Sequence, residues 1–150
     1  MPQSFSCILI HTVFSTKHRD PCITENVAPD LYKYMATILK NLDCHAQLIG
    51  GTEDHVHILH SLSRTTAPAT VIEELKSDSS KWIKKQGSSF TRFYWQTGYG
   101  SFSIGQSNVA ALKRYISNQK EHHKIQSFQD EYLELLRKYN VKYDERYMWD

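Results

Sequence analysis

The stretch HAQLIGGTEDHVHILHSL, residues 45–62, contains the pattern that decides the fold. Residues 45–51 and 54–62 have the composition of β-strands, and the segment GGTED between them is typical of a hairpin turn. Because side chains alternate between the two faces of a strand, His55 and His57 point the same way. The stretch therefore predicts a β-hairpin that carries two imidazoles on one surface.

The segments on either side of this hairpin predict two further strands and four helices. The strands, which are rich in β-branched and aromatic residues, are predicted at residues 4–14 and 90–105. The helices, in which apolar residues recur at three- and four-residue spacing, are predicted at residues 26–42, 64–86, 107–124 and 127–139. Pro68 suits the first turn of the second helix, and Ser107 has the chemistry of an N-cap for the third.

The order of these elements is β-α-β-β-α-β with C-terminal helices appended, which is the ferredoxin-like plan. This α+β plan has an antiparallel sheet with helices packed on one face. A chain of 150 residues is long enough for one domain with a real hydrophobic core, so we expect a single domain over residues 1–150. Because such a fold hosts many functions, function has to be inferred from the residues of a site.

Composition and charge indicate a soluble protein with an anionic partner. Hydrophobic residues make up 40% of the chain, and no apolar run approaches the ~18 residues that a membrane span needs. The N-terminal sequence lacks the features of a signal peptide, so we expect a cytoplasmic protein with no membrane partner. The three cysteines are widely spaced and are expected to be reduced, partly buried thiols. The net charge is only +2, but residues 76–124 contain nine Lys/Arg and two Asp/Glu and carry +7.

The two histidines by themselves are compatible with two kinds of site. A pair of imidazoles on one face can bind a metal ion, but paired histidines on a half-buried strand are also commonly structural, hydrogen-bonded residues. His60 is three residues beyond His57, so we expect it to face the other way and not to be a third ligand.

A second candidate cluster lies in the sequence YISNQKEHH, residues 115–123. On a helix, Tyr115, Gln119 and His122 are separated by four and three residues and so lie along one stripe. This spacing predicts a phenol, an amide and an imidazole close together. The alternative is that Tyr115 is a half-buried core residue and Gln119 an ordinary surface residue.

Six blocks, in this order, make the sequence resemble a known family: HTVFSTKHR, GGTEDHVHIL, FYWQTGYGSFSI, YISNQKEHH, FQDEYLELL and YDERYMWD. They are similar to the blocks of the HUH transposases with a single catalytic tyrosine, of the insertion sequence 200/605 type. HUH denotes histidine, a hydrophobe and histidine, which here are His55, Val56 and His57. Two such histidines occur often by chance, whereas the ordered set covers nearly the whole chain.

The resemblance implies metal-dependent transfer of DNA strands. It implies that His55 and His57 bind a divalent metal ion, that Gln119 completes the ligand set and that Tyr115 is the nucleophile. The implied ion is Mg²⁺ or Mn²⁺; two imidazoles alone would suggest zinc, but a neutral amide suits a harder, exchangeable ion. A phenol with a pKa near ~10 is a poor nucleophile at neutral pH, so the phosphate has to be activated by such a Lewis acid. The expected products are a 5′-phosphotyrosine and a free 3′-hydroxyl, with no small-molecule cofactor.

The implied partners are single-stranded DNA with hairpins at the ends of the element and a second copy of the chain. A homodimer is expected because two ends must be cut and each chain offers one credible nucleophile. The candidate DNA-binding residues are Lys17, His18 and Arg19 in the loop after the first strand, and Lys81, Lys85 and Arg114 in the basic segment. For any single one of these cations, the alternative is a solvated surface residue.

Two other functions remain open for this sequence. A relative that has been domesticated or serves as a housekeeping protein would bind repeated DNA hairpins, with or without strand transfer. A small zinc hydrolase would use the same histidines with Tyr115 only orienting substrate, but this reading leaves the basic segment unexplained.

Overall fold

The computed structural model describes residues 3–149, so the predicted domain of residues 1–150 includes three residues outside the described part, among them the final aspartate of YDERYMWD. The strands are β1 (Leu9–Ser15), β2 (Ala46–Gly51), β3 (His55–Ser61) and β4 (Gly100–Ile104). The helices are α1 (Ala28–Asn41), α2 (Pro68–Lys84), α3 (Val109–Ser117), α4 (Gln119–His122) and α5 (Phe128–Lys138). Short 3₁₀ turns lie at Lys17–Arg19, Ser88–Phe90, Gln106–Asn108 and Glu145–Tyr147.

The four strands form one sheet in the order β2-β3-β1-β4, and every neighbouring pair is antiparallel. This order and the β-α-β-β-α-β sequence of elements confirm the ferredoxin-like prediction. Strand β3 lies between β1 and β2, so that His57 is paired with Val13 on one side and Gly50 on the other. The histidine pair therefore sits on a central strand.

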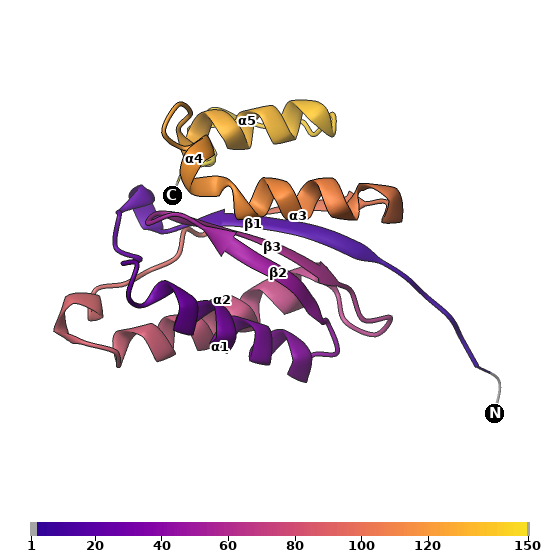
Figure 1. Cartoon of the computed structure of the whole chain (residues 1–150), viewed down its shortest axis with the longest axis horizontal. Helices are drawn as coiled ribbons and strands as arrows, with labels where there is room; N and C mark the ends of the chain where they lie inside the picture. Colours follow the sequence, from indigo (N-terminus) through magenta and orange to yellow (C-terminus); the bar gives the residue numbers. More distant parts are fainter. Residues whose placement is uncertain (1–2, 150) are drawn as a thin grey trace.

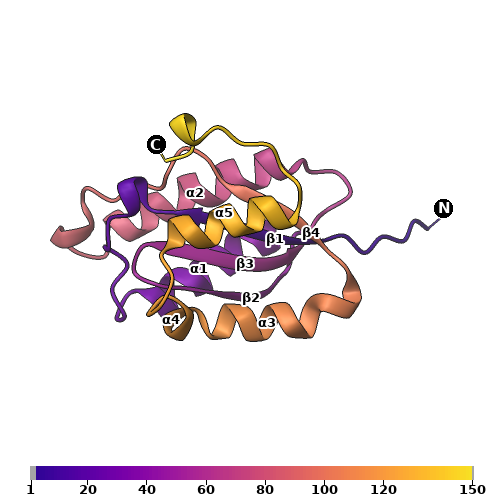
Figure 2. The ribbon, with the colours of Figure 1, turned by 90° about the horizontal axis from the view of Figure 1, so that it is seen from above.

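The sheet separates two layers of helices (Figure 1). Helices α1 and α2 lie on one face, where they bury the largest apolar cluster against alternate sheet residues that include Phe14, Val56 and Ile58. Helices α3, α4 and α5 lie on the opposite face, as the view from above shows (Figure 2). There Leu9 and Leu59 pack against α3, and Val13 packs against α5. Because strand residues alternate, this second face also receives His55 and His57.

Two predicted strands differ from the structure in extent. The first strand begins at Leu9 rather than at residue 4, and the last strand covers only Gly100–Ile104 rather than 90–105. The segment before β4 is irregular because Trp95 turns into the main core, where its indole Nε1 donates a hydrogen bond to Ser79 Oγ. The Trp95 side chain therefore packs in the core. The backbone of this segment meets the end of β1 through an isolated bridge between Trp95 and Thr16 and a hydrogen bond from Gln96 N to the Ser15 carbonyl oxygen.

The helix predicted at residues 107–124 is two helices. Asn118 has φ −97° and ψ 15°, which ends α3 at Ser117 and lets α4 begin at Gln119. Ser107 lies in a 3₁₀ turn, and Asn108 takes the N-cap position of α3. The break changes the direction of the chain between Tyr115 and Gln119.

Within residues 3–149, no helix combines the length and the hydrophobicity required to cross a membrane. Cys7, Cys22 and Cys44 are free cysteines; the expected partial burial holds for Cys22, while Cys44 is buried and Cys7 is exposed.

Candidate active site

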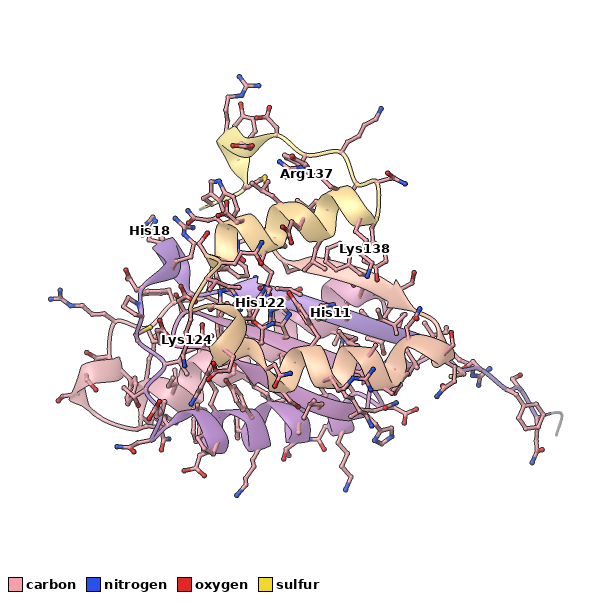
Figure 3. The ribbon with its side chains drawn as sticks, turned by 45° about the horizontal axis from the view of Figure 1, so that its top comes forward. His11, His18, His122, Lys124, Arg137 and Lys138 are labelled. Atoms are coloured by element: carbon pink, nitrogen blue, oxygen red, sulfur yellow. The ribbon has the colours of Figure 1, made fainter. Side chains whose placement is uncertain are left out.

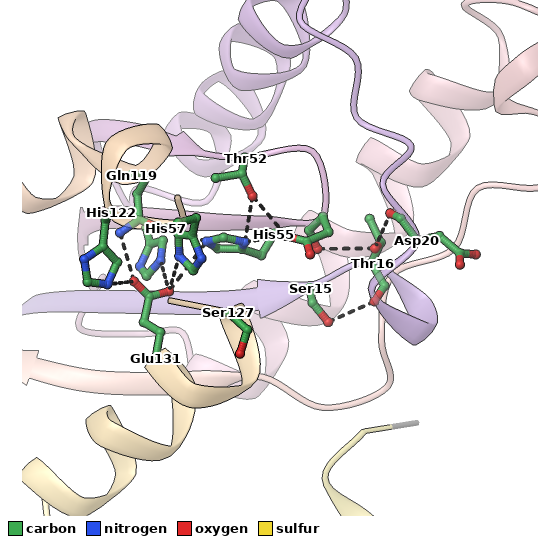
Figure 4. A network of polar contacts seen from close by, with 12 residues as sticks. Ser15, Thr16, Asp20, Thr52, His55, His57, Gln119, His122, Ser127 and Glu131 are labelled. Atoms are coloured by element: carbon green, nitrogen blue, oxygen red, sulfur yellow. Dashed lines mark hydrogen bonds and ion pairs between the residues drawn. The ribbon is translucent and has the colours of Figure 1, made fainter. Parts of the chain in front are cut away.

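Four of the residues singled out in the sequence converge on one buried point between the sheet and the C-terminal helices. His55 and His57 of β3 and Gln119 of α4 are at most 1% exposed. His55 Nε2 lies 2.9 Å from Gln119 Oε1, and both groups face the space under α5 (Figure 4). Tyr115 of α3 is half-buried, and its ring packs edge-on against His57 with 5.6 Å between the ring centroids.

Glu131 of α5 occupies the centre of this cluster and was not predicted. Its Oε1 atom lies 2.9 Å from His57 Nε2, 3.1 Å from His123 Nε2 and 3.5 Å from His55 Nε2. Its Oε2 atom accepts hydrogen bonds from the Tyr115 hydroxyl and, at 3.0 Å, from Gln119 Nε2. The carboxylate, which is 1% exposed, thus links the histidine pair to the tyrosine.

The far nitrogens of both motif histidines have hydrogen-bond partners that fix the rings. His55 Nδ1 lies 2.7 Å from Asp54 Oδ1 and 2.9 Å from Thr52 Oγ1. His57 Nδ1 lies 2.8 Å from Nε2 of the buried His11 of β1. Such partners hold an imidazole in one orientation and leave its other nitrogen, here Nε2, for a ligand.

Burial and the charge of Glu131 control the ionisation of the cluster. Burial and then the nearby His57 lower the pKa of His11 to about 3, and burial lowers the pKa of His57 although Glu131 opposes it. Burial by itself would raise the pKa of Glu131, but hydrogen bonds from His123 and His57 outweigh it and place that pKa far below its usual range. Burial lowers the pKa of His123, but its hydrogen bond to Glu131 outweighs burial and raises that pKa overall. An ionised carboxylate thus lies beside neutral His11 and His57.

Tyr115 is positioned by the close approach of α3 to β2. At Gly50 of β2, an added Cβ would lie 2.8 Å from Ile116 Cγ2 and 3.0 Å from the Ile116 carbonyl oxygen, so only a glycine admits the helix at this distance. Burial, followed by the charge of Glu131, raises the pKa of Tyr115 well above its usual value. The phenol is therefore protonated in this arrangement.

A cleft of about 640 Å³ between α3, β4 and α5 leads to this tyrosine and is lined by His11, Tyr115, Glu131 and Lys138, among others. In Figure 3, the side chains of His11 on β1 and of His122 at the end of α4 lie between the ribbons of α5 and α3. Lys138 lies at the C-terminal end of α5. The cleft gives solvent and a ligand a route to the phenol.

The donor atoms fit a divalent metal ion. An octahedral ion with ligands at ~2.1 Å places adjacent ligand atoms about 3 Å apart. The observed separations are 2.9 Å between His55 Nε2 and Gln119 Oε1 and 2.9 Å between His57 Nε2 and Glu131 Oε1. His55, His57, His123 and Glu131 offer ligand atoms that all lie within 4.8 Å of one another. The cluster is therefore compatible with a divalent metal site.

The six candidate DNA-binding residues lie in three places. Lys17–Arg19 form the turn after β1. Lys81 is exposed on α2 and Lys85 is exposed at the C-cap that follows this helix. Arg114 is exposed on α3, on the other side of the sheet. Arg19 is engaged with the C-terminal segment, because its Nη1 donates to the Trp149 carbonyl at 3.0 Å. The structure does not bring all six together.

The exposed ring of Tyr94 lies between two of these places, the turn after β1 and the end of α2. Tyr94 is 57% exposed, and the ammonium groups of Lys17 and Lys84 lie 5.9 and 4.2 Å from the centroid of its ring. Arg92 lines the same shallow pocket as Lys17 and Tyr94. A basic, aromatic surface therefore joins the end of β1 to the end of α2.

His60 faces the layer of α1 and α2, as predicted, and is buried with its Nε2 2.7 Å from Thr12 Oγ1. The residues that the sequence did not single out are Glu131, His11 and His123. A signal for Glu131 is its position on the buried stripe of α5 with Phe128, Tyr132 and Leu136.

Comparison with known proteins agrees with this arrangement. Residues 4–119, which are most of the chain, match the family described as "Transposase IS200 like". No curated protein matches the sequence.

Two solved structures share the fold. One is the crystal structure of a candidate transposase from Deinococcus radiodurans R1, with 18% identity and a TM-score of 0.62 over 79% of this chain and 98% of the other. The second is a REP-associated tyrosine transposase bound to a REP hairpin, with 10% identity and a TM-score of 0.61 over 82% of this chain and 73% of the other. The match over residues 4–119 shows the family, and the chain therefore belongs to the IS200-like transposases.

Proposed function

We propose that this chain cleaves and rejoins single-stranded DNA at hairpin-bearing element ends, through a 5′-phosphotyrosine formed on Tyr115. The observation that carries the proposal is the convergence of a tyrosine hydroxyl, two imidazoles and an amide on one buried point. A nucleophile beside a set of potential metal ligands, at the end of a cleft, is the arrangement that transfer of a phosphodiester requires.

His55, His57 and Gln119 would hold Mg²⁺ or Mn²⁺, and this ion would act as a Lewis acid toward the scissile phosphate. The chain's own residues prepare the site for it. Asp54 and Thr52 orient His55, and His11 orients His57, so that both Nε2 atoms face Gln119 and Glu131.

Strand cleavage forms one bond and breaks another. The Tyr115 oxygen bonds to phosphorus as the bond from phosphorus to the 3′-oxygen breaks; the phenol loses its proton, and the departing 3′-oxygen gains one. One phosphodiester replaces another, so the 3′-hydroxyl of a different strand can reverse the step without a nucleotide cofactor.

The DNA would contact two basic regions. Lys138 lies at the cleft that leads to Tyr115, and the surface of Lys17, Tyr94 and Lys84 offers cations and an aromatic ring to a hairpin. The related fold of a REP-associated transposase, which is bound to a REP hairpin, supports a hairpin as the ligand. His18, Lys81, Lys85 and Arg114 are exposed and would add phosphate contacts.

Two element ends need two nucleophiles, so we expect a homodimer acting in the cytoplasm. The alternative is a domesticated relative that binds repeated hairpins without strand transfer. The presence of His55, His57, Tyr115 and Gln119 favours the transposase, because binding a hairpin alone requires neither a nucleophile nor metal ligands.

The test is to incubate the protein with labelled single strands from both flanks of its own gene, with Mg²⁺ or Mn²⁺. We expect a protein–DNA adduct that survives denaturant, carries label from the DNA on the 3′ side of the cut and is lost with a chelator or in Tyr115→Phe. Tight hairpin binding without an adduct in either metal would refute strand transfer and favour the domesticated relative.

A further inference from the structure

Glu131 lies outside everything that the family match covers. The match ends at Gln119, whereas Glu131 is twelve residues further on, in α5. Its side chain is 1% exposed on the apolar stripe of an amphipathic helix, where a leucine or phenylalanine would pack with less cost. A carboxylate at this position needs compensating partners.

These partners all belong to the proposed site. Within residues 3–149, the ionic contacts of Glu131 are made with histidines alone, namely His55, His57, His122 and His123. Its hydrogen-bond donors include the Tyr115 hydroxyl and the Gln119 amide. A structural buried carboxylate is usually paired with Arg or Lys, so this set of partners points to the site itself.

The two carboxylate oxygens have separate partners. Oε1 faces the imidazoles, at 2.9 Å from His57 Nε2 and 3.5 Å from His55 Nε2, which are spacings of adjacent ligands around one ion. Oε2 faces the tyrosine and the Gln119 amide nitrogen, with His122 Nε2 at 3.4 Å. One oxygen is placed to share an ion with the histidines while the other holds the phenol.

On the basis of the proposed function, we propose that Glu131 is a fourth protein ligand of the metal ion through Oε1 and positions Tyr115 through Oε2. A carboxylate oxygen makes the donor set harder than two imidazoles and an amide, which favours Mg²⁺ or Mn²⁺ over zinc. His123, 3.1 Å from Oε1, holds the carboxylate in place. Helix α5 would thus complete a site that the motif residues leave open.

The ligand role is tested by Mn²⁺ binding to the full chain, measured by calorimetry and by the electron paramagnetic resonance signal of free Mn²⁺. We expect Glu131→Gln to raise the Kd for Mn²⁺ by about tenfold or more. The matched control is Asp130→Asn, which removes one negative charge from the neighbouring, exposed position of α5 and should leave the Kd unchanged.

If circular dichroism indicates that Glu131→Gln does not fold, Glu131→Asp replaces it, because this variant keeps the charge and retracts the carboxylate by one methylene. It should also bind Mn²⁺ more weakly than the unchanged chain. Equal affinity in a folded Glu131 variant and in the unchanged chain would overturn the ligand role.

The positioning role is tested by the rate of adduct formation at saturating Mn²⁺, where weaker binding of the ion no longer limits the reaction. We expect the Glu131→Gln rate to stay at least about tenfold below that of Asp130→Asn. Full recovery of the rate at saturating Mn²⁺ would overturn the positioning role and leave the ligand role standing.

The two proposals fail in different ways. If the unchanged chain binds Mn²⁺ and the Glu131 variants bind it weakly, but no DNA gives an adduct, Glu131 is a ligand and the transposase reaction is refuted. If the unchanged chain forms adducts and Glu131→Gln binds Mn²⁺ equally well, the reaction stands and the ligand role of Glu131 is refuted. A chain that binds no Mn²⁺ overturns the ligand role directly.

Discussion

Replacing Gly50 by alanine tests whether the packing of α3 on β2 positions Tyr115, the proposed nucleophile. The new Cβ would lie 2.8 Å from Ile116 Cγ2 and 3.0 Å from the Ile116 carbonyl oxygen. The Ile116 side chain can rotate away, but the Ile116 carbonyl belongs to the backbone of α3. The helix itself must therefore shift by a few tenths of an ångström. The neighbouring residue is Tyr115, and the shift should therefore move the phenol away from Glu131 and His57.

Overpacking of this kind costs about 1–3 kcal/mol. Alanine also restricts the backbone of the unfolded chain, which stabilises the folded state by about 0.4–1 kcal/mol. The net destabilisation should therefore be about 1–2 kcal/mol. For a domain of this size, that corresponds to a fall in Tm of about 2–8 °C. Because small misplacements of reacting groups are costly, adduct formation should fall by up to about 100-fold.

The assay combines urea denaturation with the rate of phosphotyrosine adduct formation. Gly98→Ala is the matched control, since a Cβ at Gly98 would meet no atom within 4 Å and should leave both stability and rate nearly unchanged. If Gly50→Ala matched this control in both measurements, the close approach of α3 to β2 and its role in placing Tyr115 would be refuted.

Three further predictions concern assembly, DNA binding and pH. Mixing Tyr115→Phe protein with His57→Ala protein should not restore adduct formation, because one chain holds both residues in contact; recovery in the mixture would indicate that the tyrosine acts on the partner's site. Lys17→Ala combined with Arg19→Ala should weaken hairpin binding about tenfold at low salt while Mn²⁺ binding stays the same, and unchanged affinity at moderate salt would contradict the proposed contact. Burial lowers the pKa of His60 below its ordinary 6.5, so its contribution to stability is complete above pH 6.5 and is lost as the pH falls toward the folded pKa. The free energy of unfolding, measured by urea denaturation, should therefore fall less between pH 7.5 and pH 5.5 in His60→Gln than in the unchanged chain. The difference should be at most about 1.4 kcal/mol per pH unit, and an equal fall in both proteins would refute this.

The fold could be predicted because its signals are local. The hairpin at residues 45–62 has a two-residue period and a glycine-containing turn, and the stripe of α1 has a helical period. The extent of the last strand could not be predicted. The Trp95 side chain packs into the core and the chain there leaves the sheet, and its hydrogen-bond partner Ser79 is sixteen residues away. No proline or glycine in the sequence marks the end of α3 at Ser117, where Asn118 is the C-cap.

The site was only partly predictable for the same reason. His55 and His57 share a face by the alternation of a strand. Tyr115 and Gln119 belong to two helices separated at Asn118, and they meet because both side chains reach Glu131 Oε2. Glu131, by contrast, meets His57 across 74 residues of sequence, and an acidic residue in an amphipathic helix ordinarily indicates its solvated side. Its place on the apolar stripe of α5 is a signal of burial, but only the packing of α5 over the sheet brings its carboxylate to these histidines. Which of these residues carry out the reaction stays a prediction until the variants are measured.

The division of the molecule by its sheet has a consequence for synthesis on the ribosome. The main apolar cluster, between the sheet and helices α1 and α2, draws its buried residues from Phe14 to Trp95, whereas Tyr115, Gln119 and Glu131 are translated afterwards. Because domains generally form as the chain emerges, the scaffold can be organised before the nucleophile and the carboxylate leave the exit tunnel. The second face of the sheet, where Leu9, Leu59 and Val13 lie, would be covered only when α3 and α5 follow, and the proposed site would be completed last.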